Sequence, residues 1–233
     1  MSISNDTIEY LKQKKKLLIQ RYCDINKYPS VEHPFTIFMA GSPGAGKTEF
    51  SRWFIKGISE IGLSEGIVRI DLDEIREFFP QYKKNNSHEV QSAAILGVGK
   101  IYDSVLKNKQ SAVLDGTFAK YEKSRSNVQR SLMKRRKVGI FYLYQDPIMA
   151  WEFTKKRELG EGRHISKEFF IDSFFAAREN VNRIKKEFRN KINVVLIIMD
   201  YTNNIEKSYF NIDNLDGYLK IGYDKETLSS KLC

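Results

Sequence analysis

Residues 41–48 read GSPGAGKT, and this stretch decides the fold. It meets the spacing G-x-x-x-x-G-K-S/T of a phosphate-binding loop. Glycines let phosphate oxygens approach the backbone closely, and successive N–H groups in such a loop form a nest for an anion. The apolar run PFTIFMA at 34–40 comes directly before the loop and is typical of a buried strand. The sequence therefore predicts a strand, a phosphate loop and a helix in succession.

The residues of this loop have expected roles in binding ATP and Mg²⁺. The Lys47 side chain is expected to reach the β- and γ-phosphates, and the Thr48 hydroxyl to coordinate Mg²⁺. The following helix begins at these two residues and adds its positive N-terminal end. The predicted ATP-binding residues are Gly41, Ser42, Pro43, Gly44, Ala45, Gly46, Lys47 and Thr48.

Strands and helices are predicted to alternate along the rest of the chain. Strand-like runs follow the first one at 67–71, 112–115, 138–144 and 194–199. Helical patterns lie between them at 88–108, at 120–136, from Pro147 onwards and at 166–188. This alternation favours parallel pairing with right-handed crossovers. The predicted fold class is α/β, a three-layer P-loop NTPase/kinase fold around a central parallel sheet of about five strands.

Three segments are predicted from changes in composition along the chain and from the positions of proline residues. Residues 1–33 are expected to form an N-terminal helix, at about 7–22, and a proline-containing connector. Residues 34–200 form the P-loop kinase domain. Residues 201–233 form a C-terminal extension, in which a hairpin is expected around Asn214–Gly217.

The net charge of +10, from 39 Lys and Arg against 29 Asp and Glu, favours anionic partners. These are nucleic acid, or nucleotide phosphates and sugar nucleotides. The most basic stretch, 123–137, is either a nucleic-acid-binding helix or a solvated outer face. No apolar run approaches the roughly 20 residues that a membrane span needs, so no membrane partner is expected. The two cysteines cannot form a disulfide framework, which favours a reducing cytoplasm.

Two carboxylates follow the second predicted strand, in the segment Ile-Asp-Leu-Asp at 70–73. Ligands bind at the carboxyl ends of the strands of an open parallel sheet. Asp73 is therefore a candidate general base for an acceptor hydroxyl, or else only the N-cap of a helix. Asp71 is expected to join the magnesium shell or to orient the loop. Asp71, Arg76 and Thr117 are also candidate substrate contacts.

Asp115 ends the third predicted strand and resembles a Walker-B aspartate, which holds magnesium directly or through water. The alternative role for Asp115 is a turn residue before glycine. Arg157 and Arg163 flank a segment with Gly160 and Gly162, which indicates a mobile lid. Arginines on such a lid neutralise charge on the transferring phosphoryl group. The alternative is a solvated helix end, where basic residues suit the helix dipole.

The combination of GSPGAGKT, IDLDEIREFFPQY, VLDGT and RELGEGR resembles the zeta toxin family of P-loop kinases, over about residues 34–188. That family is similar in fold to polynucleotide kinases and chloramphenicol phosphotransferases. The resemblance implies ATP-dependent phosphorylation of a hydroxyl of UDP-N-acetylglucosamine, which blocks cell-wall precursor synthesis. It also implies Asp73 as the general base, Arg157 and Arg163 as lid arginines, and a protein antitoxin as a candidate partner.

The substrate-binding part of the family pattern departs from this sequence at two places. The family has an acidic residue in the helix before the third strand, where residues 97–102 read GVGKIY and the first acid is Asp103. A threonine of the family has Ser126 and Asn127 as its nearest polar counterparts. The alternatives are therefore a polynucleotide, nucleoside or antibiotic kinase, and an ATP-binding nucleic-acid module without transfer activity.

Overall fold

A mixed sheet lies at the centre of the computed structural model, which describes residues 3–62, 66–161, 164–220 and 222–232. Within these ranges the sheet has six strands in the order β2-β3-β1-β4-β5-β6. The first five of that order are parallel, which confirms the predicted fold class, and β6 is antiparallel to β5. The strands are β1 Phe35–Ala40, β2 Val68–Asp71, β3 Ala112–Asp115, β4 Lys137–Tyr144, β5 Asn193–Met199 and β6 Ile205–Tyr209.

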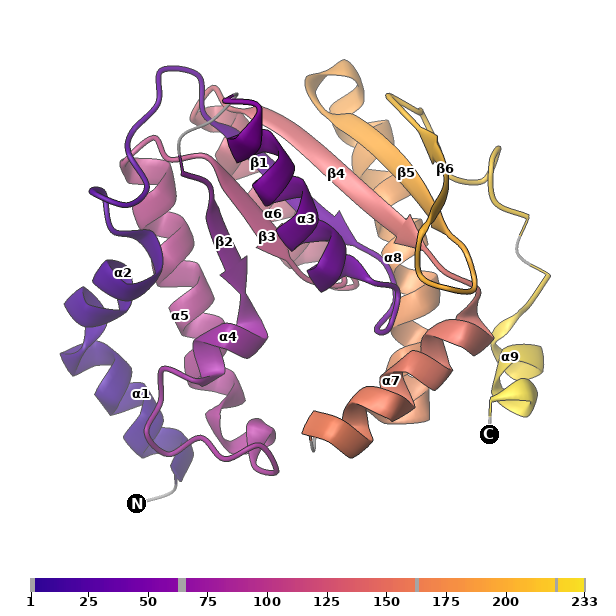
Figure 1. Cartoon of the computed structure of the whole chain (residues 1–233), viewed down its shortest axis with the longest axis horizontal. Coiled ribbons are helices and arrows are strands. Elements are labelled where there is room, and N and C mark those ends of the chain that lie inside the picture. The colour runs from indigo at the N-terminus through magenta and orange to yellow at the C-terminus, as the bar shows by residue number, and fades with distance from the viewer. Residues whose placement is uncertain (1–2, 63–65, 162–163, 221, 233) are drawn as a thin grey trace.

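Helices cover both faces of the sheet (Figure 1), with α3 on one face and α5, α6 and α8 on the other. The helices are α1 Ile3–Gln13, α2 Lys15–Cys23, α3 Lys47–Glu60, α4 Leu72–Arg76, α5 Ser87–Lys107, α6 Tyr121–Met133, α7 Pro147–Glu161, α8 Lys167–Phe188, the 3-10 turn η1 Arg189–Lys191 and α9 Lys225–Lys231. The single helix expected at 7–22 is two helices, because the chain leaves helical geometry at Lys14.

The core has two main parts because alternate strand residues face opposite layers. On β1, Ile37 and Met39 pack with Phe50 of α3. Their neighbours Phe38 and Ala40 belong to the larger cluster, which includes Val181 of α8. Burial on both faces explains why the central strands read as continuous apolar runs. Within the described ranges, every helix is too short or too polar to cross a bilayer.

The C-terminal extension adds a strand and a helix to this framework. The hairpin expected around Asn214–Gly217 is wrong in position: the turn lies between β5 and β6, where Asp200 Oδ1 accepts from the backbone N–H groups of Thr202 and Asn204 at 2.8 and 2.9 Å. Further on, α9 packs against α7 and α8 in a third apolar cluster. Leu228 of α9 is fully buried there.

The N-terminal helices α1 and α2 pack on α5, at the end where α5 meets α4. Gly97 of α5 lies at this junction. A Cβ at Gly97 would be 3.1 Å from Ile75 Cγ2 on α4 and 3.7 Å from Leu18 Cδ2 on α2. Tyr22 of α2 also donates to the Glu74 carbonyl oxygen at 2.7 Å. The N-terminal segment therefore supports α4, which carries Asp73.

We expect Gly97→Val to lower the free energy of unfolding by about 1–3 kcal/mol, because the added carbons overpack the contact with Ile75. Gly99→Val is the matched control. A Cβ at Gly99 would meet nothing within 4 Å, so that variant should stay within about 0.5 kcal/mol of wild type. Urea denaturation followed by circular dichroism measures both. Equal stability of the two variants would contradict close packing at Gly97.

Candidate active site

The phosphate loop joins β1 to α3 and has the backbone that its glycines permit. Gly44 and Gly46 have φ of 73° and 81°, and Gly46 is the N-cap of α3 with no side chain capping the helix. A Cβ at Gly44 would overlap the Ala150 carbonyl oxygen of α7. The loop therefore leads into the N-terminus of α3 without a capping side chain, an arrangement that suits the binding of a phosphate chain.

Lys47 lies over this loop. Its side chain is buried, and Nζ donates to the carbonyl oxygen of Ser42 at 2.6 Å. This contact connects the seventh residue of the loop, Lys47, to its second residue, Ser42. A fixed ammonium beside a backbone nest suits the terminal phosphates of a nucleoside triphosphate.

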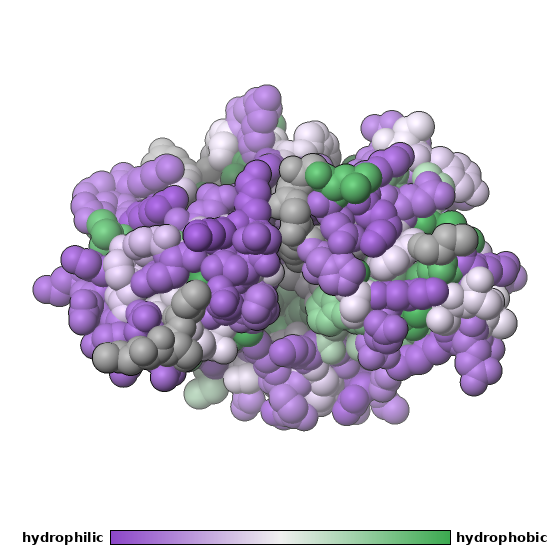
Figure 2. Space-filling model, turned by 90° about the horizontal axis from the view of Figure 1, so that it is seen from below, coloured by the Kyte–Doolittle hydropathy of each residue, from purple (hydrophilic) through white to green (hydrophobic). Residues whose placement is uncertain are grey.

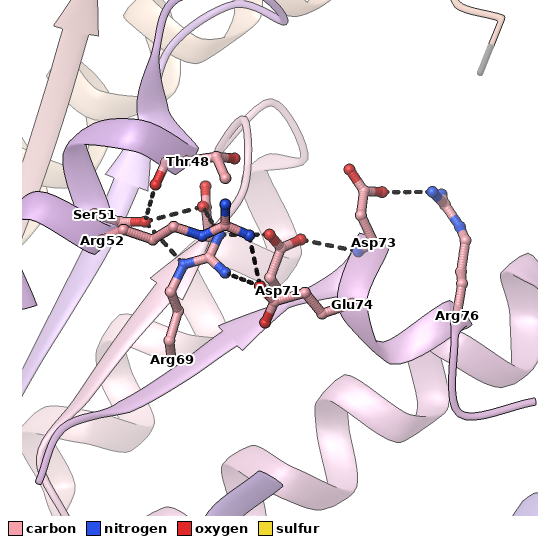
Figure 3. A network of polar contacts seen from close by, with 9 residues as sticks. Thr48, Ser51, Arg52, Arg69, Asp71, Asp73, Glu74 and Arg76 are labelled. Atoms are coloured by element: carbon pink, nitrogen blue, oxygen red, sulfur yellow. Dashed lines mark hydrogen bonds and ion pairs between the residues drawn. The ribbon is translucent and has the colours of Figure 1, made fainter. Parts of the chain in front are cut away.

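Asp71 and Asp73 lie at the junction of β2 with α4 and have different surroundings. Asp71 is the N-cap of α4, and its Oδ1 accepts from the Asp73 N–H at 2.9 Å. The capping role considered for Asp73 is therefore wrong: the helix begins two residues earlier than an Asp73 cap requires, and Asp71 is the N-cap. Asp73 lies in the first turn, where its Oδ1 accepts from Arg76 Nη1 at 2.5 Å (Figure 3).

Arg76 is buried, and Gln91 is its second hydrogen-bond partner besides Asp73. Its Nε and Nη2 donate to Gln91 Oε1 of α5 at 3.2 and 2.5 Å. Burial lowers the pKa of its guanidinium, while the charge of Asp71 opposes that change. Arg76 thus links α4 to α5 and fixes the direction of the Asp73 carboxylate.

Arg69 of β2, which no local sequence pattern indicates as a site residue, connects the carboxylates of Asp71, Glu74 and Asp115. Its Nη2 donates to Asp71 Oδ2 and Asp115 Oδ2, both at 2.5 Å, and its Nη1 to Glu74 Oε1 at 2.5 Å. Its Nε donates to Ser51 Oγ at 2.9 Å. Burial opposes the charge of Arg69, but the charges of Asp71 and Asp115 raise its pKa.

Asp115 is the most enclosed of these carboxylates. Burial and the charge of Asp71 raise its pKa, while Arg69 and Lys47 act in the opposite direction. Ser51 of α3 also donates to Asp115 Oδ2 at 3.1 Å. The carboxylate is therefore held between the helix that follows the phosphate loop and the neighbouring strand β2.

One cavity of about 310 Å³ gathers most of the predicted site residues. Seen from the side of α4 and α7, the surface is hollowed near its middle, and hydrophilic residues predominate around the hollow (Figure 2). Arg163 lies outside the described residues. The predicted residues that line the cavity are Pro43, Gly44, Gly46, Lys47, Thr48, Asp71, Asp73, Arg76, Asp115, Thr117 and Arg157.

Sequence comparison agrees with this geometry. The family model described as zeta toxin matches residues 19–214. The chain belongs to the zeta toxin family. A search of curated proteins finds no significant sequence match.

Solved structures share the fold of this zeta toxin family member at low sequence identity. One belongs to the PezAT chromosomal toxin-antitoxin system of Streptococcus pneumoniae, with TM-score 0.64, 15% identity, and coverage of 100% of this chain and 90% of that one. Another is the AvrRxo1-ORF1:-ORF2 complex, with TM-score 0.65, 17% identity, and coverage of 90% and 71%. The same complex with ATP gives TM-score 0.62 at 15% identity, covering 97% and 71%.

The cavity lining does not include the residues that the family pattern suggested for substrate binding. Asp103, Ser126 and Asn127 are not among its lining residues, and Asp103 instead pairs with Arg130 of α6. The first turns of α5 contribute Ser87 and Gln91 to the lining. Neutral polar side chains of α5 therefore line the cavity, whereas Asp103 of the same helix does not.

Three of the four arginines in the basic stretch 123–137 contact other groups of the protein. Arg125 donates to Glu187 Oε1 of α8 at 2.6 Å, and Arg130 pairs with Asp103. Arg136 is buried, with its Nε donating to Thr36 Oγ1 at 2.7 Å. These contacts explain three of the basic residues without a nucleic acid.

The residues that would hold magnesium are few but suitably placed. Thr48 and Asp115 both line the cavity beside the phosphate loop. Over the part of the chain that the structure describes, no cluster of three or more His, Cys, Asp or Glu residues could bind a metal by itself. Mg²⁺ is commonly held by one or two protein groups together with substrate phosphates and water, and this sparse donor set fits that mode.

Proposed function

We propose that this zeta toxin family member transfers the γ-phosphoryl group of ATP to a hydroxyl of a small anionic sugar nucleotide, with UDP-N-acetylglucosamine as the expected acceptor. The observation that supports it best is the meeting of three groups in one cavity. They are Lys47 on the phosphate loop, Asp73 on α4 and Arg157 on α7. Phosphoryl transfer uses a cation for the terminal phosphates, a carboxylate for the acceptor and a further cation for the transferring group.

In the proposed reaction, the phosphate-loop N–H groups and Lys47 hold the triphosphate. Thr48 and Asp115 would hold Mg²⁺, Asp115 through water because Arg69 and Ser51 already contact its Oδ2. The bound ion supplies positive charge to the phosphates. Asp73 takes the proton of the acceptor hydroxyl while the hydroxyl oxygen bonds to the γ-phosphorus. The bond between the γ-phosphorus and the β–γ bridging oxygen breaks, and ADP leaves with that oxygen. Arg157, and Arg163 by the resemblance, stabilise the charge of the transferred group.

The acceptor specificity is the finer part of the proposal. Thr117 lines the cavity after β3 and is assigned a direct substrate contact. Asp71 and Arg76 line it too, but with oxygens and nitrogens already bonded to Arg69, Asp73 and Gln91. We assign these two residues to shaping the acceptor side. Because three of the four arginines of 123–137 already contact groups of the protein, a polynucleotide acceptor is the second choice.

The proposal also covers a protein partner and a cellular location. Toxin-antitoxin is the description of the PezAT relative, and a protein antitoxin is proposed as a partner of this chain. Cys23 is a buried free thiol, which suits the proposed cytoplasmic location.

A transfer assay with γ-labelled ATP tests the proposed reaction. The acceptors to compare are UDP-sugars, nucleosides, oligonucleotides, and aminoglycoside and phenicol antibiotics. We expect label on UDP-N-acetylglucosamine and not on the oligonucleotide. Label on an antibiotic or nucleoside alone would overturn the acceptor assignment, and label on none of them would overturn the transferase.

Lys47→Ala should weaken binding of a non-hydrolysable ATP analogue by about 10- to 100-fold, the value of a hydrogen bond between charged groups. Lys56→Ala is the matched control, since Lys56 lies on the same helix with its side chain 77% exposed. It should bind as wild type does. Isothermal titration calorimetry measures both. Unchanged affinity in Lys47→Ala would contradict the phosphate loop as the ATP site.

A further inference from the structure

We infer that Arg69 is a positioning residue for Asp73, acting through the Asp71 carboxylate. The inference rests on the proposed function, because Asp73 is the proton acceptor in that reaction. The chain of contacts runs from Arg69 on β2 to Asp71, and from Asp71 to the backbone of Asp73 (Figure 3).

The first link is the fixed position of Arg69. Its side chain is 10% exposed, so few conformations are open to it. Its guanidinium donates in several directions at once, to the carboxylates of Asp71, Glu74 and Asp115 and to the Ser51 hydroxyl. These partners come from β2, α4, β3 and α3. Arg69 therefore ties the base of α4 to the helix that follows the phosphate loop.

The second link is the Asp71 carboxylate, whose two oxygens accept hydrogen bonds from different donors. Oδ2 accepts from Arg69 at 2.5 Å, and Oδ1 accepts from the Asp73 N–H at 2.9 Å. The terminal torsion of an aspartate is soft and nearly two-fold, so a capping carboxylate can turn unless its other oxygen is held. Arg69 supplies that restraint. Without it, the first turn of α4 loses a restraint on its backbone, and Asp73 moves with that turn although its carboxylate stays paired with Arg76.

The third link is the shape of the group at position 69. A planar guanidinium can address several acceptors from one place, whereas an ammonium is a single point of charge on a flexible stem. Glu74 and the Asp71–Asp115 pair are contacted by different nitrogens of Arg69. Lysine would keep the charge but not all of these directions. The site therefore depends on arginine in particular.

The test compares Arg69→Lys with Arg52→Lys in the transfer assay. Arg52 donates to the same Glu74 Oε1, at 2.9 Å, but its side chain is 62% exposed. We expect Arg69→Lys to lower kcat about 100-fold, as a small misplacement of a reacting group can do, with the KM for ATP nearly unchanged. Arg52→Lys should keep wild-type kcat. Wild-type kcat in folded Arg69→Lys would overturn the inference.

A double variant decides whether Asp73 is the residue that Arg69 positions. In the Asp73→Asn background, Arg69→Lys should lower kcat little further, because the group it positions has already lost its function. A full additional 100-fold loss, or a large rise in the KM for ATP, would mean that Arg69 acts through Asp115 and the nucleotide instead, and would overturn the inference.

Amide hydrogen exchange gives a result that does not depend on activity. The Asp73 N–H should exchange faster in Arg69→Lys than in wild type, while the Ile140 N–H of β4, a strand that does not pair with β2, should not change. If the wild-type protein transfers no phosphate but this difference is seen, the proposed function fails and the contact chain stands. If the Asp73 exchange rate is unchanged, the positioning role fails whatever the activity. A variant of Arg69 that does not fold is replaced by Asp71→Asn, which keeps a capping oxygen and should show the same loss of kcat.

Discussion

Arg157→Ala should lower phosphoryl transfer by about 10³-fold or more, the loss that follows removal of a transition-state arginine. Arg157 projects from α7 into the cavity that Lys47 and Asp73 also line. In the proposed reaction, its charge would neutralise the negative charge of the transferring phosphoryl group. Single-turnover transfer from labelled ATP measures the effect.

The matched control is Lys156→Ala, one position earlier on the same helix. Lys156 is exposed and its ammonium lies 5.7 Å from the ring centre of Phe153, so this variant tests a helix-end charge away from the cavity. It should keep turnover within about twofold. If both variants retain full activity, Arg157 is only a helix-end charge. The same loss is expected of Arg163→Ala from the resemblance.

The parallel part of the fold could be predicted because apolar runs and the phosphate-loop motif are local signals. The strand expected at 112–115 is β3 as observed. Strand β6 could not be found this way. Its sequence IEKSY is mostly exposed and has no apolar face, so it forms because β5 offers an edge and the Asp200 turn reverses the chain. The break at Lys14 was missed because no glycine or proline marks it.

The candidate site could be predicted where its functional residues lie close together in the sequence and form a motif. The phosphate loop and the D-x-D segment are such motifs. The difference between Asp71 and Asp73 could not be read, because either aspartate can cap a helix and only the observed start of α4 separates them. Arg69 and Gln91 were missed for another reason. Their partners lie on other elements, as Arg69 with Asp115 and Gln91 with Arg76, and pairings across elements leave no local pattern in one sequence.

Asp73→Asn should lower turnover by about 10²- to 10⁴-fold, the contribution of a positioned general base. An amide is nearly the same size as a carboxylate but cannot accept the hydroxyl proton. The amide oxygen can still accept from Arg76 Nη1, and the backbone N–H can still donate to Asp71 Oδ1. The free energy of unfolding should therefore change by no more than about 1–2 kcal/mol. ATP affinity should be retained, since the loop and Lys47 are intact.

Glu77→Gln provides the control for loss of a negative charge on this segment. Glu77 is the exposed C-cap residue of α4, and it is not among the residues that line the cavity. Its turnover should stay within about twofold of wild type. Thermal melts and turnover per folded molecule are measured for both variants. Early melting with normal turnover in Asp73→Asn would make Asp73 a structural partner of Arg76, and the base would then have to be sought at Asp71. That residue is a poorer base in the present geometry, because one of its oxygens accepts from Arg69 and the other from the Asp73 N–H.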